Sequence, residues 1–260
     1  MSTKAIRNMA VEIDGEGETI LFIHGLGGSS NTWTPLQAAL SGFMRIRPDL
    51  PGSARSSTPS TPASIATHVS AMVDLLGSLG VKSAHVVAHS LGSIVAQHLA
   101  VEHPELVKSL ALFGPLVAPP EAGRAGTLAR AALARTGVAA MQEIADTIVN
   151  AATSKETKAE RPTAVALVRE SVMRQPPEGY AINCEILAGA QSAAIEQISV
   201  PTLLLSGDQD NVAPVANVAA MATRIKGSNQ VVLEACGHWP TFEQPQLCVT
   251  QLRHFYELGV

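Results

Sequence analysis

Val86-Val87-Ala88-His89-Ser90-Leu91-Gly92-Ser93-Ile94-Val95 is the segment on which the predicted architecture depends. Residues 84–88 form an apolar run typical of a buried strand, and helically spaced apolar residues follow directly. Ser90 lies between them, with the small residues Ala88 and Gly92 two positions away on either side. The pattern predicts a nucleophile elbow, a tight strand-to-helix turn that exposes a serine hydroxyl.

This motif has a second interpretation, because serine at the start of a helix is often only an N-cap. Ala88 also stands where glycine is commoner in the elbow. If the turn is an elbow, the backbone N–H of Leu91 points toward an oxyanion that forms beside Ser90. The remaining segments of the chain decide between the two interpretations.

A glycine-rich loop, His24-Gly25-Leu26-Gly27-Gly28-Ser29, follows an apolar strand predicted at 19–23. Its glycines lack the spacing of a dinucleotide fingerprint, and no Walker lysine follows them. The loop instead suits the second half of an oxyanion hole, with Gly25 close to the substrate and the N–H of Leu26 as donor. His24 is then expected to brace the loop and not to act as a base.

Strands and helices alternate along the first part of the chain, which predicts a parallel sheet with right-handed crossovers. Strands are predicted at 5–13, 19–23, 43–47, 84–88 and 107–113, and helices at 33–40, 63–79 and from 91 to about 103. From 115 to 194 no buried strand is evident, and helical periodicity occurs at 127–133, 138–149, 163–173 and 180–191.

Eighty residues are too many for a loop in a compact domain. We therefore expect residues 1–114 and 195–260 to form the core domain and residues 115–194 to form an inserted helical cap. The alternative is that these helices only thicken one face of the sheet.

The sheet is expected to resume at 200–207, followed by Asp208-Gln209-Asp210, and again at 230–233, followed by Cys236-Gly237-His238-Trp239-Pro240. A closing helix is predicted at 245–258. Candidate serine, aspartate and histidine residues thus each follow a parallel strand, and such loops share one edge of an open sheet. The occurrence of all three residue types at one edge favours the interpretation of Ser90 as a nucleophile over that as an N-cap.

The amino-acid composition argues against several classes of function. The chain has 260 residues, 46% of them hydrophobic, and a net charge of −4, which offers no basic surface for nucleic acid. We expect no membrane span, no signal peptide, no metal and no cofactor. Cys184, Cys236 and Cys248 match no metal motif, and free thiols are typical of a reducing cytoplasm.

Over its whole length the chain resembles the α/β-hydrolases, and most closely small cytoplasmic esterases and enol-lactonases similar to 3-oxoadipate enol-lactonase. The resemblance rests on these segments: His24-Gly25-Leu26-Gly27, Arg45-Ile46-Arg47-Pro48-Asp49-Leu50-Pro51-Gly52, Ser56, Ala88-His89-Ser90-Leu91-Gly92, Gly207-x-x-Asp210-x-x-x-Pro214 and Gly237-His238. It implies an α/β-hydrolase fold with a helical cap. It also implies a Ser90, Asp210 and His238 triad, with Asp208 as the alternative acid.

Several further residues are candidates for the substrate pocket: Gly25, Trp33, His89 and Trp239. Arg124, Arg130 and Arg135 lie in the predicted cap, where one could bind a substrate carboxylate, although solvated helix-face arginines are the commoner case. Cys236 is not expected to be a nucleophile beside a serine elbow.

The leading hypothesis is hydrolysis of a small carboxylic ester or lactone through an acyl-enzyme on Ser90. Alternatives are a carbon–carbon bond hydrolase or a cofactor-free perhydrolase on the same triad, and a slow-turnover, hydrolase-like ligand receptor. The sequence indicates neither the natural substrate nor the oligomeric state.

Overall fold

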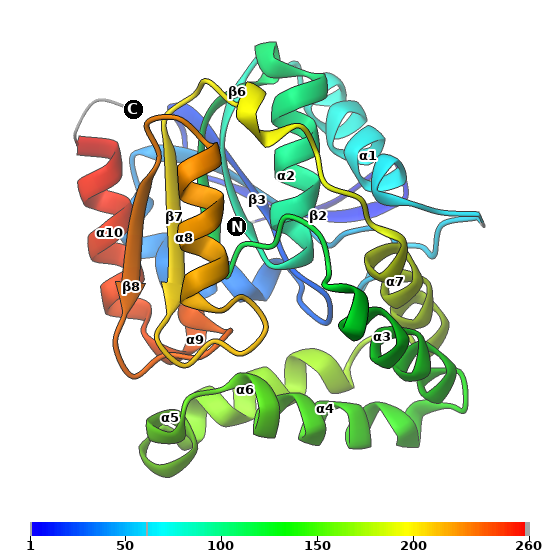
Figure 1. Cartoon of the computed structure of the whole chain (residues 1–260). Coiled ribbons are helices and arrows are strands. Elements are labelled where there is room, and N and C mark those ends of the chain that lie inside the picture. Colours follow the sequence, from blue (N-terminus) through cyan, green and yellow to red (C-terminus); the bar gives the residue numbers. More distant parts are fainter. Residues whose placement is uncertain (1, 61, 258–260) are drawn as a thin grey trace.

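The computed structural model describes residues 2–60 and 62–257. The strands are β1 (Ser2–Ile6), β2 (Met9–Asp14), β3 (Glu18–Ile23), β4 (Phe43–Pro48), β5 (Ala84–His89), β6 (Val107–Phe113), β7 (Thr202–Gly207) and β8 (Asn229–Leu233). In the described residues they form one sheet in the order β1-β2-β4-β3-β5-β6-β7-β8 (Figure 1). The pairs from β4 to β8 are parallel, so the predicted α/β class with a mostly parallel sheet is confirmed.

The N-terminal strand prediction was wrong in one respect, because residues 5–13 do not form a single strand. Arg7 and Asn8 both have positive φ, 50° and 64°, and turn the chain between β1 and β2. Two successive residues in this conformation are characteristic of a tight hairpin turn. The hairpin extends the sheet at the β4 edge, where β2 pairs antiparallel with β4.

Helices cover both faces of the sheet. They are η1 (Ser30–Leu40), α1 (Ile65–Ser78), α2 (Leu91–Glu102), η2 (Pro104–Leu106), η3 (Ile195–Gln197), α8 (Val215–Arg224), α9 (Pro240–Glu243) and α10 (Pro245–Glu257). Successive strand residues point to opposite faces. Leu21 and Ile23 of β3 belong to a buried cluster that includes residues of α1, α2 and α8. Ile20 and Phe22 belong to another cluster, which includes residues of η1 and α10. Leu258, the end of the predicted closing helix, lies outside the described residues.

Five α-helices occur between β6 and η3: α3 (Glu121–Ala134), α4 (Val138–Ala152), α5 (Lys155–Glu160), α6 (Pro162–Met173) and α7 (Pro177–Gly189). We call residues 121–189 the helical segment. Figure 1 shows it beyond one end of the sheet, near α9 and the loop that precedes α8. Most of its buried apolar side chains form a separate cluster, which Trp239 and Phe242 join. Three residues of α7, Ile182, Ile186 and Leu187, instead belong to the cluster that contains residues of β3, α1 and α2.

The short helix α5 was not predicted. Its sequence has no apolar periodicity, and it begins because the Ser154 hydroxyl accepts a hydrogen bond from the Thr157 N–H. Among the described residues, no helix is long and apolar enough to cross a membrane.

Candidate active site

The predicted elbow holds Ser90 in a backbone conformation that is unusual for any residue other than glycine. Ser90 has φ 51° and ψ −119° between the end of β5 and the start of α2. Such strain persists only where the surroundings enforce it, and it is common at functional sites. A Cβ on Gly92 would lie 2.3 Å from the carbonyl oxygen of Ile23, so this position requires glycine. Ala88 is fully buried in the sheet, which accommodates its methyl group.

Three loops that are distant in the sequence meet at this turn. The distance from His238 Nε2 to Ser90 Oγ is 2.8 Å, and that from His238 Nδ1 to Asp210 Oδ2 is also 2.8 Å. An ionised carboxylate can only accept, so Nδ1–H donates to Asp210 and Nε2 is left to accept the serine proton. The structure thus brings together the three residues that the sequence nominated.

The two candidate acids have different partners. Asp210 contacts His238, and its other oxygen accepts hydrogen bonds from the N–H groups of residues 212 and 213 at 2.8 and 2.7 Å. Burial would raise the pKa of Asp210, but His238 and these hydrogen bonds lower it below its ordinary value. Asp208 instead accepts a hydrogen bond from the Cys236 N–H at 3.0 Å. Only Asp210 orients the imidazole.

Gly114, at the end of β6, is a site residue that the sequence analysis missed. It has φ +51°, and a Cβ there would lie 2.9 Å from Cε1 and Nδ1 of His238 and 3.2 Å from Asp210 Oδ2. The available signal was a glycine directly after the apolar strand 107–113. A side chain at this position would displace the imidazole.

The loop after β3 lies against the elbow. A Cβ on Gly25 would lie 2.8 Å from Ser90 Cβ, which explains the need for glycine. In the part of the chain that the structure describes, the backbone N–H groups of Leu26 and Leu91 donate no hydrogen bond. Two free donors next to a serine hydroxyl are what an oxyanion hole requires.

His24 braces this loop. Its Nδ1–H donates to the Gly25 carbonyl at 2.8 Å, and its Nε2 accepts from the Leu50 N–H at 2.9 Å. Burial lowers the pKa of His24, so the ring stays neutral in this one tautomer. His24 therefore supports the loop, as expected, and has no contact that would make it a base for Ser90.

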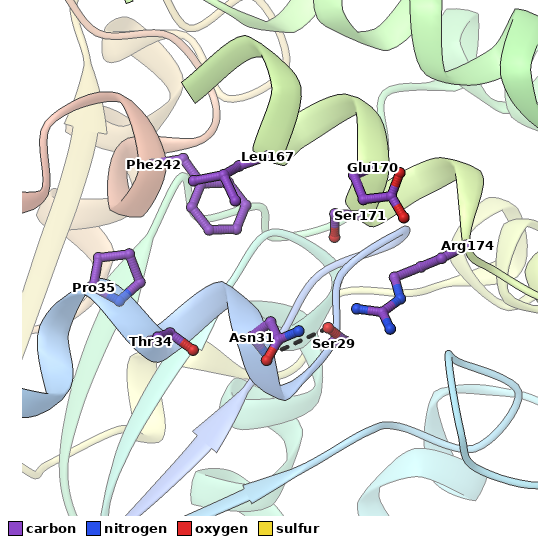
Figure 2. Close-up of a pocket in the computed structure, with 9 residues that line it drawn as sticks. All are labelled: Ser29, Asn31, Thr34, Pro35, Leu167, Glu170, Ser171, Arg174 and Phe242. Atoms are coloured by element: carbon purple, nitrogen blue, oxygen red, sulfur yellow. Dashed lines mark hydrogen bonds between the residues drawn. The ribbon is translucent and has the colours of Figure 1, made fainter. Parts of the chain in front are cut away.

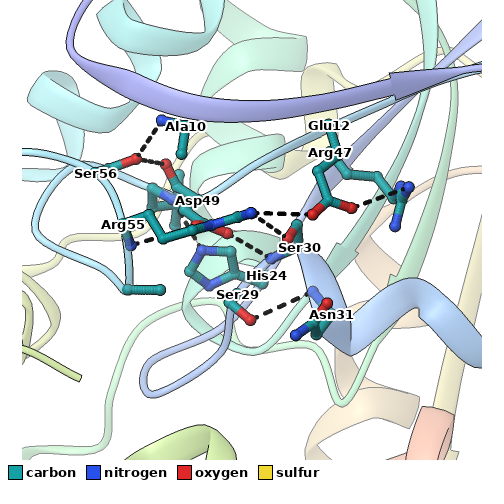
Figure 3. A network of polar contacts seen from close by, with 12 residues as sticks. Ala10, Glu12, His24, Ser29, Ser30, Asn31, Arg47, Asp49, Arg55 and Ser56 are labelled. Atoms are coloured by element: carbon teal, nitrogen blue, oxygen red, sulfur yellow. Dashed lines mark hydrogen bonds and ion pairs between the residues drawn. The ribbon is translucent and has the colours of Figure 1, made fainter. Parts of the chain in front are cut away.

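A charged network holds the start of η1 next to the same loop (Figure 3). Asp49 accepts a hydrogen bond from the Ser30 N–H at 2.8 Å and from Arg55 Nε at 2.7 Å. Arg55 also reaches the Ser30 hydroxyl at 2.8 Å, and Ser56 donates to the Asp49 carbonyl at 2.6 Å. The segment from Asp49 to Ser56, which carried part of the resemblance, is thus a support for the loop.

His89, a candidate for the substrate pocket, lies beside the loop that carries His238. It is buried, and its Nε2–H donates to the backbone carbonyl of His238 at 2.6 Å. Burial, followed by the charge of the nearby His238, lowers the pKa of His89 to about 3. His89 is therefore a neutral support for the histidine loop.

Most of the sequence matches a known family. Residues 18–245 correspond to the family described as the alpha/beta hydrolase fold. The chain belongs to this family. The expected α/β-hydrolase fold is therefore confirmed, with the sheet and flanking helices described above.

Similar proteins of this family include enol-lactonases and other hydrolases. The 3-oxoadipate enol-lactonase 2 of Acinetobacter baylyi is 29% identical over 92% of this chain and 88% of that enzyme. The (E)-2-((N-methylformamido)methylene)succinate hydrolase of the same organism is 23% identical over 89% of this chain and 88% of that protein. The enol-lactonase structure from Burkholderia xenovorans has a TM-score of 0.90 at 26% identity and covers 98% of this chain and 100% of that one.

The two tryptophans of this α/β-hydrolase lie in different places. Trp239 is buried against the helical segment and stacks on Phe242, with ring centroids 5.9 Å apart. Trp33 packs between Phe22 and Phe113 in the core formed with η1 and α10, so the expectation that it lines the substrate pocket was wrong. The apolar spacing of η1 turns Trp33 toward the sheet.

The three arginines of the helical segment differ in their partners. Arg124 donates to the carbonyl groups of Ala188 and Ala190, and Arg135 forms ion pairs with two exposed glutamates of α7. Arg130 lines a cavity of about 460 Å³ between α3 and α4, and it faces the buried Tyr180 hydroxyl. Among the described residues, Arg130 forms no ion pair.

This cavity adjoins the triad loops. Most of its lining is apolar, and it includes Ala152 and Val212. The Ala152 carbonyl accepts a hydrogen bond from the His238 N–H at 2.8 Å, and the Val212 N–H donates to Asp210. Two residues that line the cavity are thus hydrogen-bonded to His238 and Asp210.

A second pocket, of about 360 Å³, lies between η1, α6 and Phe242 (Figure 2). Its lining contains Glu170 and Arg174 but neither Ser90 nor His238. Ser171, which lines it, donates to the carbonyl of Gly27 at 2.8 Å. This pocket therefore adjoins the glycine loop without including the candidate catalytic side chains Ser90 and His238 in its lining.

The three cysteines are free and buried. Burial raises the pKa of each thiol, to about 12 for Cys184. The thiols are therefore protonated at neutral pH, and Cys236 has no thiolate that could compete with Ser90 as nucleophile.

Proposed function

We propose that this α/β-hydrolase cleaves a small carboxylic ester or lactone through an acyl-enzyme on Ser90. The observation that carries the proposal is the continuous chain of contacts from Asp210 through His238 to Ser90, with 2.8 Å at both steps. No cofactor takes part in this reaction. The partner is a small-molecule substrate.

In the first half of the reaction, Ser90 Oγ attacks the substrate carbonyl while His238 Nε2 takes its proton. Asp210 holds the ring tautomer and stabilises the imidazolium. Collapse of the tetrahedral intermediate breaks the bond to the leaving oxygen, which receives the proton from His238. In a lactone, this oxygen stays attached to the acyl group.

In the second half, His238 takes a proton from water, and the resulting hydroxide attacks the acyl carbonyl. The proton then returns to Ser90 Oγ, and the carboxylic acid leaves. The N–H groups of Leu26 and Leu91 hold the oxyanion in both halves, and each donor contributes about 3 kcal/mol to lowering the barrier.

Residues 115–194 act in this proposal as a cap over the triad, and the cavity between α3 and α4 accommodates part of the substrate. Among the described residues that line this cavity, Arg130 is the one with a positive charge, and its guanidinium is available for a substrate carboxylate. The names of two relatives also contain carboxylates, 3-oxoadipate and succinate. We therefore expect a preference for acidic esters or lactones.

A substrate panel on the full chain tests the proposal. We expect hydrolysis of p-nitrophenyl acetate and of simple lactones followed by pH-stat, together with covalent labelling of Ser90 by a fluorophosphonate. Ser90→Ala should fold normally and lose turnover by about 10⁶-fold. Turnover by Ser90→Ala near the wild-type rate would contradict the proposal.

The same panel separates the alternatives. Cleavage of a vinylogous diketone without ester turnover would indicate a carbon–carbon bond hydrolase. Peroxide-dependent halogenation would indicate a perhydrolase. Tight binding with no turnover and no labelling of Ser90 would indicate a ligand receptor.

A further inference from the structure

Glu243, the last residue of α9, is a buried carboxylate whose partners are three backbone N–H groups. Its Oε2 accepts hydrogen bonds from Gly237 at 3.0 Å and from Ser154 at 2.8 Å, and its Oε1 accepts one from Trp239 at 3.0 Å. Only 2% of its surface is exposed. Among the described residues, no lysine, arginine or histidine forms an ion pair with it.

The three donors come from two parts of the molecule. Gly237 and Trp239 are the immediate neighbours of His238, so the carboxylate grips the histidine loop on both sides of the imidazole. Ser154 lies in the turn between α4 and α5, in the helical segment. One side chain therefore joins the candidate base to the helices that cover the site.

The turn and the loop are also in direct backbone contact. The His238 N–H donates to the Ala152 carbonyl at 2.8 Å. A Cβ on Gly237 would lie 2.6 Å from that carbonyl oxygen and 2.8 Å from Ser154 N, so only glycine allows this approach. Glu243 accepts hydrogen bonds from N–H groups on both sides of the contact and fixes its register.

Hydrogen bonds to an ionised acceptor are shorter and stronger than neutral ones. A buried N–H group that loses its acceptor must also bear the full cost of its desolvation. Removal of the carboxylate would leave such groups at Gly237 and Trp239, where a small shift changes the distance from His238 to Ser90. The chemistry of a base is sensitive to displacements of this size.

We propose that Glu243 is a positioning residue for His238, which sets the imidazole against Ser90 and couples it to the turn between α4 and α5. This role rests on the proposed function, because it presumes that His238 is the base. Glu243 itself touches neither the substrate nor the reacting atoms.

The test compares Glu243→Gln and Glu243→Asp with the wild-type full chain. Gln keeps the shape but turns one acceptor oxygen into an NH₂ group that faces an N–H donor. Asp keeps the charge but is one methylene too short to reach both sides. We expect either change to lower kcat for p-nitrophenyl acetate by about 10- to 100-fold, with KM within a factor of two. Fluorophosphonate labelling of Ser90 should slow in parallel.

The matched control for a loss of stability is Leu252→Val, a change in the core on the face of the sheet covered by α10. It should lower the melting temperature and leave kcat unchanged well below that temperature. If the Glu243 variants also lose only thermal stability, the residue is merely structural and the proposal is wrong.

A second pair of variants addresses the coupling to the helical segment and does not require the Glu243 variants to fold. Ser154 has φ −66°, which proline can adopt, so Ser154→Pro deletes the N–H donor. Ser154→Ala keeps that N–H and loses only the hydroxyl. We expect a lower kcat for Ser154→Pro than for Ser154→Ala, and equal values would refute the coupling. A wild-type chain in which Ser90 is never labelled would instead contradict the proposed function, and this proposal with it.

Discussion

The loops at the end of the sheet and the helical segment contribute to the site in different ways. The loops carry Ser90, Asp210 and His238, and their geometry depends on glycines that permit close backbone approach. The helical segment supplies none of these three side chains. It contributes backbone groups at the turn between α4 and α5 and the lining of the cavity between α3 and α4.

Under the proposed function, the loops determine the chemical step and the helical segment determines the choice of substrate. A loop pressed between backbone atoms tolerates few sequences, which is why the elbow and the glycine loop are visible as motifs. A helix that packs by apolar contacts tolerates many sequences, provided that volume and pattern are kept. Changes in the loops should therefore affect every substrate, and changes in the helical segment should affect some substrates more than others.

Among the variants that retain Ser90, the largest expected effect concerns the two aspartates after β7. Asp210→Asn should reduce kcat by about 10⁴-fold, because an amide cannot hold the imidazole tautomer that accepts the serine proton. Asp208→Asn, its matched control, retains an oxygen acceptor for the Cys236 N–H and should keep activity within a factor of a few. Steady-state kinetics with p-nitrophenyl acetate measures both. Equal losses in the two variants would contradict the assignment of Asp210.

An intermediate effect is expected from the arginines of the helical segment. Arg130→Gln should lower kcat/KM for p-nitrophenyl hydrogen glutarate, relative to neutral p-nitrophenyl butyrate, by about 10- to 100-fold. That factor corresponds to the loss of a charged hydrogen bond worth about 1.5–3 kcal/mol. Arg135→Gln, which removes only exposed ion pairs, should leave the ratio unchanged. A ratio unaffected by Arg130→Gln would remove this residue from substrate recognition.

The smallest effect concerns a contact between the core helix α1 and helix α7 of the helical segment. His68 of α1 is buried and bonds to Asn183 of α7 at 2.9 Å, and burial lowers its pKa from 6.5 to about 4. The unfolded chain binds a proton near pH 6.5 that the folded one does not bind until about pH 4. The free energy of unfolding should therefore decrease as the pH is lowered through this window, by about 1.4 kcal/mol per pH unit for each such histidine.

Urea unfolding between pH 7 and 4.5 measures this slope. His68→Gln cannot be protonated, so its slope should be smaller by about one proton, with the contributions of His24 and His89 remaining. Identical slopes for this variant and the wild type would show that His68 does not remain neutral in the fold.

The features that were predictable from the sequence are those imposed by local backbone constraints. Apolar runs identified the parallel strands, and the spacing of small residues around Ser90 identified the elbow. The hairpin at Arg7 and Asn8 was missed because arginine is not a usual choice for positive φ, although asparagine is. Trp33 was misassigned because an aromatic side chain near a glycine loop suits a pocket and a core equally well.

The remaining features depend on contacts between distant segments. Gly114 matters only because His238 arrives from a loop more than a hundred residues later. Glu243 resembles any surface glutamate in the sequence, and its role arises where Ser154 and Gly237 meet. Such positions carry no periodic signal, so a single sequence cannot reveal them.

The burial of the free thiols gives each region its own chemical reporter. Cys184 belongs to α7, whereas Cys236 and Cys248 belong to the sheet core. An alkylating reagent can modify each sulfur only when its surroundings open. The order in which the three are modified under mild denaturant would therefore reveal whether the helical segment detaches first or comes apart together with the sheet.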